Sequence, residues 1–467
     1  MGVSVRRHGM DLTTGSIFRK MLIFALPLVL TNLLQTLYNV ADMIVVGRFS
    51  LVDGAVGAIG CTSSFVTLVN NFIFGLATGA TVVVSQAIGA GDDTAIRRGV
   101  HTSLMMGLIV GFACLGLGQV LCVPMLTLLG TASEYMAMSV EYCRICFAGL
   151  PFVAILNCAL GIMRAQGDSA RPLVILSLSG VLNVILNVAF VTAFHMDVDG
   201  VALATMISNA ASTVAAMVCL ARDNGVCRFS FKELRIHPAT MRKVLGVGIP
   251  SGMQGMLFTV SNMINQAAVN SLGLVTITAC SIEVNLHSFI YTACNAIASA
   301  SMTFAGQNVG ARNYRRIMPI LFNAYLIVLL IGGALAAVIF ALLDPLAGLY
   351  MNEATSNRAQ IHEVVRLIAV YRVLFMPLAG LMDCGALTLR GIGRSTLSMV
   401  ISLIGACGFR VAWIYTVFAA VRERWAMFIS YPISWALTAV AAFLGVWLVS
   451  CQLIRKSEAE VSTPTTV

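Results

Sequence analysis

Charged residues are scarce in this chain, and their scarcity excludes a soluble protein. They make up 10% of the 467 residues, whereas hydrophobic residues make up 58% and the mean hydropathy is +0.90. A soluble domain carries roughly 25% charged residues and needs far less apolar material for its core. The composition therefore predicts a protein that is embedded in a membrane.

Motifs for nucleotide binding and for catalysis are also absent from the sequence. There is no Walker A motif, no G-x-G-x-x-G that opens a helix after a strand, and no G-x-S-x-G. The six histidines do not cluster. We therefore expect no enzyme, no resident metal and no cofactor. A membrane enzyme or a receptor stays open as an alternative, to be tested by a search for substrate turnover.

Long apolar runs are what the chain has instead. A bilayer core about 30 Å thick is crossed by about 20 residues of helix. The alternation that is typical of barrel strands is absent, and a helix satisfies its own backbone polar groups in lipid. We predict an all-α membrane protein with twelve transmembrane helices. The predicted spans are 20–46, 55–88, 100–123, 140–163, 172–194, 200–221, 244–272, 276–306, 317–343, 364–389, 396–419 and 425–452.

Basic residues concentrate in alternate loops between these spans, and the loop 222–243 alone holds six of them. Cytoplasmic loops accumulate Lys and Arg, so we predict that both termini are cytoplasmic. The expected location is a cell membrane of the bacterial inner-membrane type. The net charge of +9 then reflects contact with lipid headgroups and not with nucleic acid. We expect a monomer whose partners are membrane lipids and small organic substrates.

The chain repeats itself with an offset of 221 to 226 residues. Examples are Pro27 with Pro250, Gln86 with Gln307, and the run from Pro151 to Ser169 with that from Pro377 to Ser395. This pattern predicts two six-helix lobes related by a pseudo-two-fold axis along the membrane normal. The predicted boundaries are a cytoplasmic segment 1–19, a lobe 20–221, a linker 222–243, a lobe 244–452 and a tail 453–467.

Polar residues inside the spans indicate a water-filled cavity. On the first span the spacing of Gln35, Asn39 and Asp42 places them on one helical face. Ordinary hydrogen bonds between helices are the alternative for the amides. The residues predicted to line a substrate cavity are Gln35, Asn39, Asn157, Asn183, Asn187, Asn262, Asn265 and His287.

Three acids are candidates for coupling to an ion: Asp42, Asp383 and Glu283. In the repeat, Asp42 matches Asn265 and Asp383 matches Asn157, and only the acid of each pair can bind and release a proton. A carboxyl in a low-dielectric cavity can hold a proton until a cation arrives. Two alternatives stay open. Asp42 could reach the headgroups, and Glu283, with His287 one turn later, could be a structural partner of Arg144, Arg372 or Arg410.

Prolines occupy matching positions in the two halves. Pro27 and Pro250 interrupt one pair of spans, and Pro151 and Pro377 interrupt another. A proline removes a helical hydrogen bond and bends the helix. The four prolines are therefore hinge candidates, with static kinks as the alternative.

Taken together, several of these residues resemble the multidrug and toxic compound extrusion (MATE) family. They are Pro27, Asp42 and Gly47 in P-x14-D-x4-G, the Q-x-x-G-A at Gln86, and the R-A-Q-G-D-S from Arg164 to Ser169. The resemblance covers residues 15 to 450. It implies two lobes that exchange Na⁺ or H⁺ for bulky, mainly cationic organic compounds. It also implies ion coupling at Asp42, a candidate Na⁺ ligand, and at Asp383.

The chain departs from the family pattern at two positions. Asn187 follows Asn183 where an archaeal type has an aspartate, and the acid of another branch near Phe258 is missing. Glu283 is a candidate replacement. The expected function is a secondary active multidrug exporter that works by alternating access. The alternative is a flippase for lipid-linked saccharides, which would use the membrane-level arginines to bind pyrophosphate.

Overall fold

The computed structural model describes residues 9–49, 55–128, 131, 133–194, 196, 198–351 and 357–462. Side chains are described throughout these ranges except at residues 38–49, 55–61, 64, 135, 198, 461 and 462. Every regular element within the described ranges is a helix. The all-α prediction is therefore confirmed.

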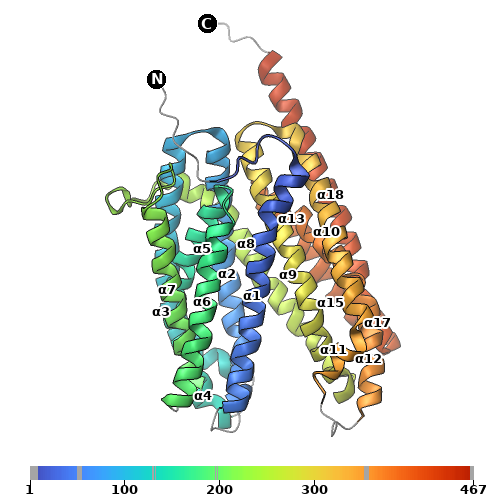
Figure 1. Cartoon of the computed structure of the whole chain (residues 1–467). Coiled ribbons are helices and arrows are strands. Elements are labelled where there is room, and N and C mark those ends of the chain that lie inside the picture. The colour runs from blue at the N-terminus through green and yellow to red at the C-terminus, as the bar shows by residue number, and fades with distance from the viewer. Residues whose placement is uncertain are drawn as a thin grey trace. The chain divides into compact units, whose positions relative to one another are not determined.

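The helices follow one another with short connections (Figure 1). The first half of the chain contains α1 (Ile17–Phe49), α2 (Ala55–Ala90), α3 (Asp93–Leu128), α4 (Ser133–Ala148), α5 (Leu150–Ala165), α6 (Ala170–Val188), the π-helical η1 (Ala189–Ala193), α7 (Val198–Ala221) and the 3₁₀ turn η2 (Phe231–Glu233). The second half contains α8 (Pro238–Asn270), α9 (Leu274–Gly310), the 3₁₀ turn η3 (Tyr314–Arg316), α10 (Ile317–Ala341), α11 (Leu343–Gly348), α12 (Arg358–Arg372), α13 (Met376–Gly391), α14 (Ser395–Ser402), the π-helical η4 (Leu403–Gly408), α15 (Phe409–Trp413), the π-helical η5 (Ile414–Phe418), α16 (Ala419–Val421), α17 (Arg424–Phe428) and α18 (Ser430–Ser462).

Eleven helices of the described ranges are long and apolar enough to cross a membrane. A twelfth span results if Met136–Ala148 and Leu150–Ala165, which are bent by 42° at the break between them, are one span. The predicted spans therefore reappear as helices of suitable length. The bend explains why one predicted run, 140–163, is divided between α4 and α5.

Contacts divide the chain into two compact units. The N-terminal unit comprises Met1–Asp11 and Leu30–Met256, and the C-terminal unit comprises Leu12–Val29 and Leu257–Val467. The first part of α1 thus belongs with the second half of the chain, and the first part of α8 with the first half. The predicted lobe boundaries and the pseudo-two-fold axis stay predictions.

A glycine contact joins α2 to the first part of α8 within the N-terminal unit. A Cβ atom on Gly75 would lie 2.1 Å from the backbone nitrogen of Gly252, and one on Gly79 would lie 2.3 Å from the carbonyl oxygen of Val244. Small residues allow helix backbones to approach closely, which is how membrane helices gain packing energy without a hydrophobic driving force. These glycines therefore set the distance between α2 and α8.

The segment that follows α7 packs back onto the start of α3 in the same unit. His101 Nε2 accepts a hydrogen bond from the Ser230 amide, at 3.1 Å, and Thr102 Oγ1 accepts one from the His237 amide, at 3.2 Å. Arg97 pairs with Glu233 at 3.3 Å. The basic residues on α3 and on the predicted linker therefore lie at one end of this unit. The side of the membrane that this end faces stays a prediction.

In the C-terminal unit, α9 packs against α10, α12 and α13, and α13 packs against α18. The segment Leu12–Val29 is fixed to the end of α9. The Leu12 amide donates to Gln307 Oε1 at 3.2 Å, and Asn308 donates to the Leu12 carbonyl oxygen at 3.1 Å. The Phe24 and Phe304 rings meet edge to face, with centroids 6.1 Å apart. Hydrogen bonds to the Leu12 backbone and the packing of Phe24 on Phe304 together hold this segment in place.

π-helical turns interrupt the corresponding span in both halves of the chain. One lies at η1, after α6, and two lie at η4 and η5, on either side of α15. Isolated π turns are rare and occur frequently at functional sites. In the second half they flank the short helix that carries a buried arginine, Arg410.

Candidate functional site

Asp383 lies on α13 and faces α9 within the C-terminal unit. Asn295 Nδ2 approaches its Oδ2 atom at 3.5 Å, and Tyr291 and Arg390 are its electrostatic neighbours. The two helices approach closely because Gly380 meets Cys294: a Cβ on this glycine would lie 2.8 Å from the Cys294 Cβ. Asp383 is half-buried and forms no ion pair with a described residue. Its carboxylate and the oxygens of Asn295 and Tyr291 are of the kind that bind a proton or a hard cation such as Na⁺.

Glu283 lies on α9 and is completely buried. Its Oε2 atom is 2.9 Å from Arg372 Nη1, and its Oε1 atom is 3.1 Å from His287 Nδ1. The prediction that His287 shares a face with Glu283 is confirmed. The structure shows an ion pair of Glu283 with Arg372, and a coupling role of Glu283 stays a prediction.

The tautomer of His287 follows from its second contact. Arg372 Nη2 is 3.4 Å from His287 Nε2, and a guanidinium group only donates hydrogen bonds. Nε2 is therefore the acceptor, and Nδ1 carries the proton that it donates to Glu283. The imidazole is neutral in this arrangement, so Glu283 and Arg372 balance one another.

Arg410 lies next to this group and is 5% exposed. Its Nε atom donates to Ser434 Oγ at 2.8 Å, and its Cζ atom lies 4.3 Å from the centroid of the Tyr431 ring. Arg372 contacts the same ring at 4.7 Å. Two guanidinium groups therefore share one aromatic ring, and each gains from the negative face of its π system.

The amides that were predicted to line a cavity in the N-terminal unit bind other protein groups. Asn157 donates to the Val153 carbonyl oxygen at 2.8 Å. Asn187 donates to Asn183 Oδ1, and Asn183 donates to Thr205 Oγ1, both at 3.3 Å. The last contact joins α6 to α7 and fits the alternative of ordinary interhelical hydrogen bonds. A role of these amides in substrate binding stays a prediction.

The remaining polar residues predicted for the site lie on α1 and α8. Gln35 and Asn262 are exposed. Asn265 is 2% exposed, and neither its Oδ1 nor its Nδ2 atom has a hydrogen-bond partner among the described residues. The side chains of Asn39 and Asp42 lie outside the described part of the chain, as does the candidate Na⁺ site at Asp42.

The four prolines occupy two structural settings. Pro27 lies inside α1 and Pro250 lies inside α8. Pro151 lies in the first turn of α5, directly after the 42° bend, and Pro377 lies in the first turn of α13. A first turn tolerates proline because its N–H groups have no partner in the helix. Their role as hinges stays a prediction.

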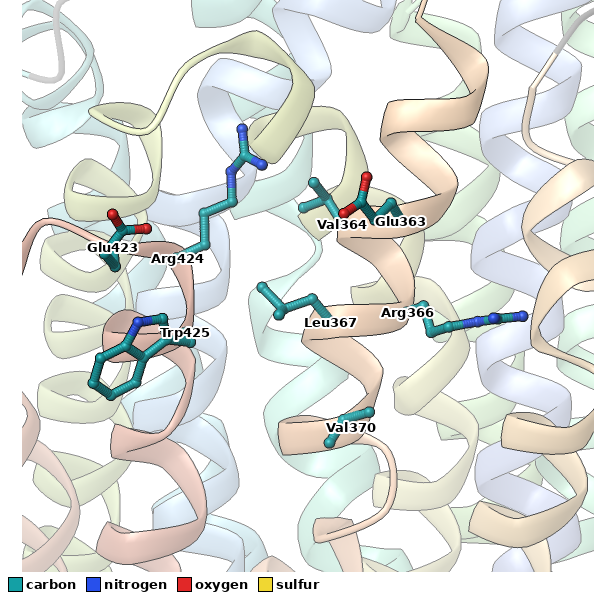
Figure 2. Close-up of a pocket in the computed structure, with 8 residues that line it drawn as sticks. All are labelled: Glu363, Val364, Arg366, Leu367, Val370, Glu423, Arg424 and Trp425. Atoms are coloured by element: carbon teal, nitrogen blue, oxygen red, sulfur yellow. The ribbon is translucent and has the colours of Figure 1, made fainter.

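A cavity of about 390 Å³ lies between α12 and α17, and none of the predicted site residues lines it. Figure 2 shows Leu367 pointing from α12 towards the wall formed by Arg424 and Trp425. A second cavity of about 330 Å³ lies at the basic end of the N-terminal unit. The first cavity is lined by Glu363, Val364, Arg366, Leu367, Val370, Glu423, Arg424 and Trp425. The second cavity is lined by Thr94, Arg97, Arg98, His101, Lys232, Glu233, Arg235 and His237.

From the sequence, Arg372 and Arg410 were candidate partners of Glu283 and candidate pyrophosphate ligands, and the aromatic residues between them were missed. Tyr431 lies about 150 residues from Glu283, and no local pattern links the two. The available signal was the rarity of arginine at membrane depth, which by itself marks a functional position.

Comparison with known proteins agrees with this architecture. The family model MatE matches residues 27–189 and again residues 250–416. The two matches begin at the paired prolines, Pro27 and Pro250, as the internal repeat predicts.

Relatives and solved structures cover nearly the whole chain. It is 24% identical to a probable multidrug resistance protein, YoeA, of Bacillus subtilis (strain 168), over 91% of this chain and 92% of the relative. It is 22% identical to an FAD transporter of Shewanella oneidensis, over 85% and 87%. The structure of a multidrug resistance MATE family transporter of the MOP superfamily in its outward-facing conformation has the same fold. The TM-score is 0.87 at 20% identity, over 96% of this chain and 99% of that one.

Proposed function

The chain belongs to the MatE family of multidrug efflux transporters, and we propose that it exports amphiphilic, mainly cationic organic compounds in exchange for Na⁺ or H⁺. The exchange proceeds by alternating access, without a cofactor. The relatives are named for drugs and for FAD, so their names do not define one substrate. The proposal rests on the residues of this chain.

The difference between Asp383 and Glu283, the two candidate coupling acids whose side chains are described, carries the proposal. Glu283 is neutralised by Arg372 at 2.9 Å. Asp383 has the Asn295 amide at 3.5 Å and Arg390 as an electrostatic neighbour, but it forms no ion pair with a described residue. A carboxylate that has no ion-pair partner can bind either a small cation or a cationic substrate, but not both at once. This competition is the simplest physical basis of obligatory exchange.

Asp383 is therefore assigned the role of coupling residue, together with Asp42. Glu283 holds Arg372 and His287 in position. The driving force is adequate, since one charge that crosses 100 mV supplies about 2.3 kcal/mol. Asn157, at the repeat position that matches Asp383, keeps the shape of a carboxylate but cannot titrate.

The test uses purified protein in proteoliposomes, with a Na⁺ gradient and a H⁺ gradient imposed separately and ethidium as the substrate. A coupling free energy of 1–3 kcal/mol corresponds to roughly 5- to 150-fold, and Asp383→Asn should slow ion-driven transport by that order. Glu458→Gln is the matched control because Glu458 is an exposed acid that pairs with Arg315. Ethidium transport that survives the collapse of both gradients would reject ion coupling.

A flippase for lipid-linked saccharides is the second candidate, and the buried Arg372 and Arg410 favour it because pyrophosphate is anionic. It predicts gradient-independent movement of a lipid-linked pyrophosphate saccharide across the proteoliposome bilayer. Ethidium transport driven by an ion gradient, without any such lipid movement, would decide in favour of the exporter.

A further inference from the structure

The buried charges of the described residues around Tyr431 do not sum to zero. Arg372 and Arg410 are positive, Glu283 is negative, and His287 is neutral by its hydrogen-bonding pattern. Among the described residues, one positive charge is therefore in excess in a part of the unit that is 0–8% exposed at Glu283, Arg372, Arg410 and Tyr431. An uncompensated charge at membrane depth is costly and marks a functional position.

The excess charge belongs to Arg410. No described carboxylate lies within ion-pair distance of its guanidinium group, and its electrostatic neighbours are Tyr431, Arg372 and Cys407. The Nε atom is used by Ser434, and the Tyr431 and Trp435 rings lie 4.3 and 5.5 Å from Cζ. The Nη2 atom is buried and has no hydrogen-bond partner among the described residues. A strong, positively charged donor is thus left for a ligand.

The fold does not require this arginine. At the repeat offset of 226, the position that matches Arg410 is Val184, and the position that matches Arg372 is Cys146. At the offset of 221, Glu283 matches Thr62. The first half of the chain thus builds its corresponding helices without any of these charges. The two π-helical turns next to Arg410, η4 and η5, provide a second, independent mark of a functional position.

We propose that Arg410 binds an anionic group, a carboxylate, sulfonate or phosphate, of an amphiphilic molecule that the protein handles. Nη2 donates the specific hydrogen bond, and the neighbouring Arg372 adds to the positive potential. The Tyr431 and Trp435 rings exclude water from the guanidinium group, which strengthens the interaction. The site widens the proposed export function from cationic compounds to compounds with a negative group.

Two dyes that share a xanthene ring system but differ in charge test the site. Fluorescein is anionic, and tetramethylrhodamine methyl ester is cationic. Binding of each to the purified full-length protein is measured by fluorescence anisotropy in uncharged detergent. Loss of one charge-assisted hydrogen bond corresponds to about tenfold or more in affinity. We expect Arg410→Gln to weaken fluorescein binding by at least that factor and to leave the rhodamine ester bound as tightly as before or more tightly.

A conservative variant and a control variant test whether the effect is specific to the Arg410 guanidinium group. Arg410→Lys keeps the charge without the fork of donors, so it should bind fluorescein with an affinity between those of the wild type and Arg410→Gln. Arg315→Gln is the matched control because Arg315 is exposed and far from the cluster in sequence, and it should bind both dyes as the wild type does. Equal affinity of wild type and Arg410→Gln for fluorescein would overturn the proposal. The proposal would also be overturned if Arg410→Gln kept the wild-type unfolding midpoint but lost affinity for both dyes by the same factor.

The anionic group could come from a transported compound or from a lipid headgroup, and competition separates these sources. If phosphatidylglycerol micelles displace fluorescein from the wild type, the natural occupant is a headgroup. If they do not, and fluorescein moves across a proteoliposome bilayer in an Arg410-dependent manner, the occupant is a transported compound. The binding assay needs no ion gradient. Failure of ion coupling would therefore refute the proposed exchange and leave the anion site standing.

Discussion

Removing the acid of the Glu283–Arg372 pair should destabilise the C-terminal unit strongly. Glu283 is 0% exposed, and its two oxygens lie 2.9 Å from Arg372 and 3.1 Å from His287. Glu283→Gln keeps the shape of the side chain but leaves Arg372 as a second unbalanced cation beside Arg410. Breaking a buried pair from one side costs about 3–5 kcal/mol because the remaining charge is uncompensated.

The double variant Glu283→Gln/Arg372→Gln removes both charges and should recover most of that loss. A buried ion pair contributes little net stability, since desolvation offsets the attraction between its charges. The coupling free energy from the double-mutant cycle should therefore be large, about 2 kcal/mol or more. It is measured by titrating the detergent-solubilised protein with sodium dodecyl sulfate and following the loss of helix by circular dichroism.

The matched control is Glu458→Gln, which removes an exposed acid paired with Arg315 at 2.9 Å. An exposed pair is worth about 0–1 kcal/mol, so this variant should unfold close to the wild-type midpoint. A Glu283→Gln variant that unfolds within about 1 kcal/mol of the wild type, or a double variant less stable than the single one, would refute the reasoning.

Two further changes probe the packing of each unit. Gly75→Ala should destabilise the N-terminal unit by about 1–3 kcal/mol, because the new Cβ would lie 2.1 Å from the Gly252 backbone nitrogen. Gly246→Ala is the control and should leave stability unchanged, because nothing lies within 4 Å of its new Cβ. Equal unfolding midpoints for the two variants would contradict the close contact of α2 and α8. Gln307→Ala should cost about 1–3 kcal/mol because the buried Leu12 amide loses its acceptor at 3.2 Å. Faster proteolysis near Leu12 would report the release of this segment, and an unchanged digestion pattern would argue against the contact.

Sequence patterns predicted the helical class and most of the spans because membrane depth acts on each helix separately. A run of about 20 apolar residues is a local property, and lipid leaves the backbone only one way to satisfy its polar groups within such a run. The internal repeat was also readable, since the spacing between Pro27 and Pro250 survives in the order of residues. The same local reasoning placed His287 one turn after Glu283.

The sequence did not predict which distant side chains pair, because pairing depends on which faces of separate helices meet. The choice of Arg372 rather than Arg144 or Arg410 as the partner of Glu283 is made by the packing of α12 against α9. Likewise, Asn183 and Thr205 contact one another only because α6 packs on α7. Hydrophobic periodicity gives the apolar stripe of a helix but not the neighbour that covers it.

The sequence by itself predicted that this chain crosses the membrane as helices, that its halves repeat one another, and that acids and arginines lie within the predicted spans. Tertiary structure alone decided which of those charges are balanced. Among the described residues, Asp383 forms no ion pair, Glu283 is held by Arg372, and the Nη2 donor of Arg410 has no partner. The physical reason is that the free energy of a buried charge depends on atoms within a few ångströms of it, and these atoms come from helices far apart in the chain.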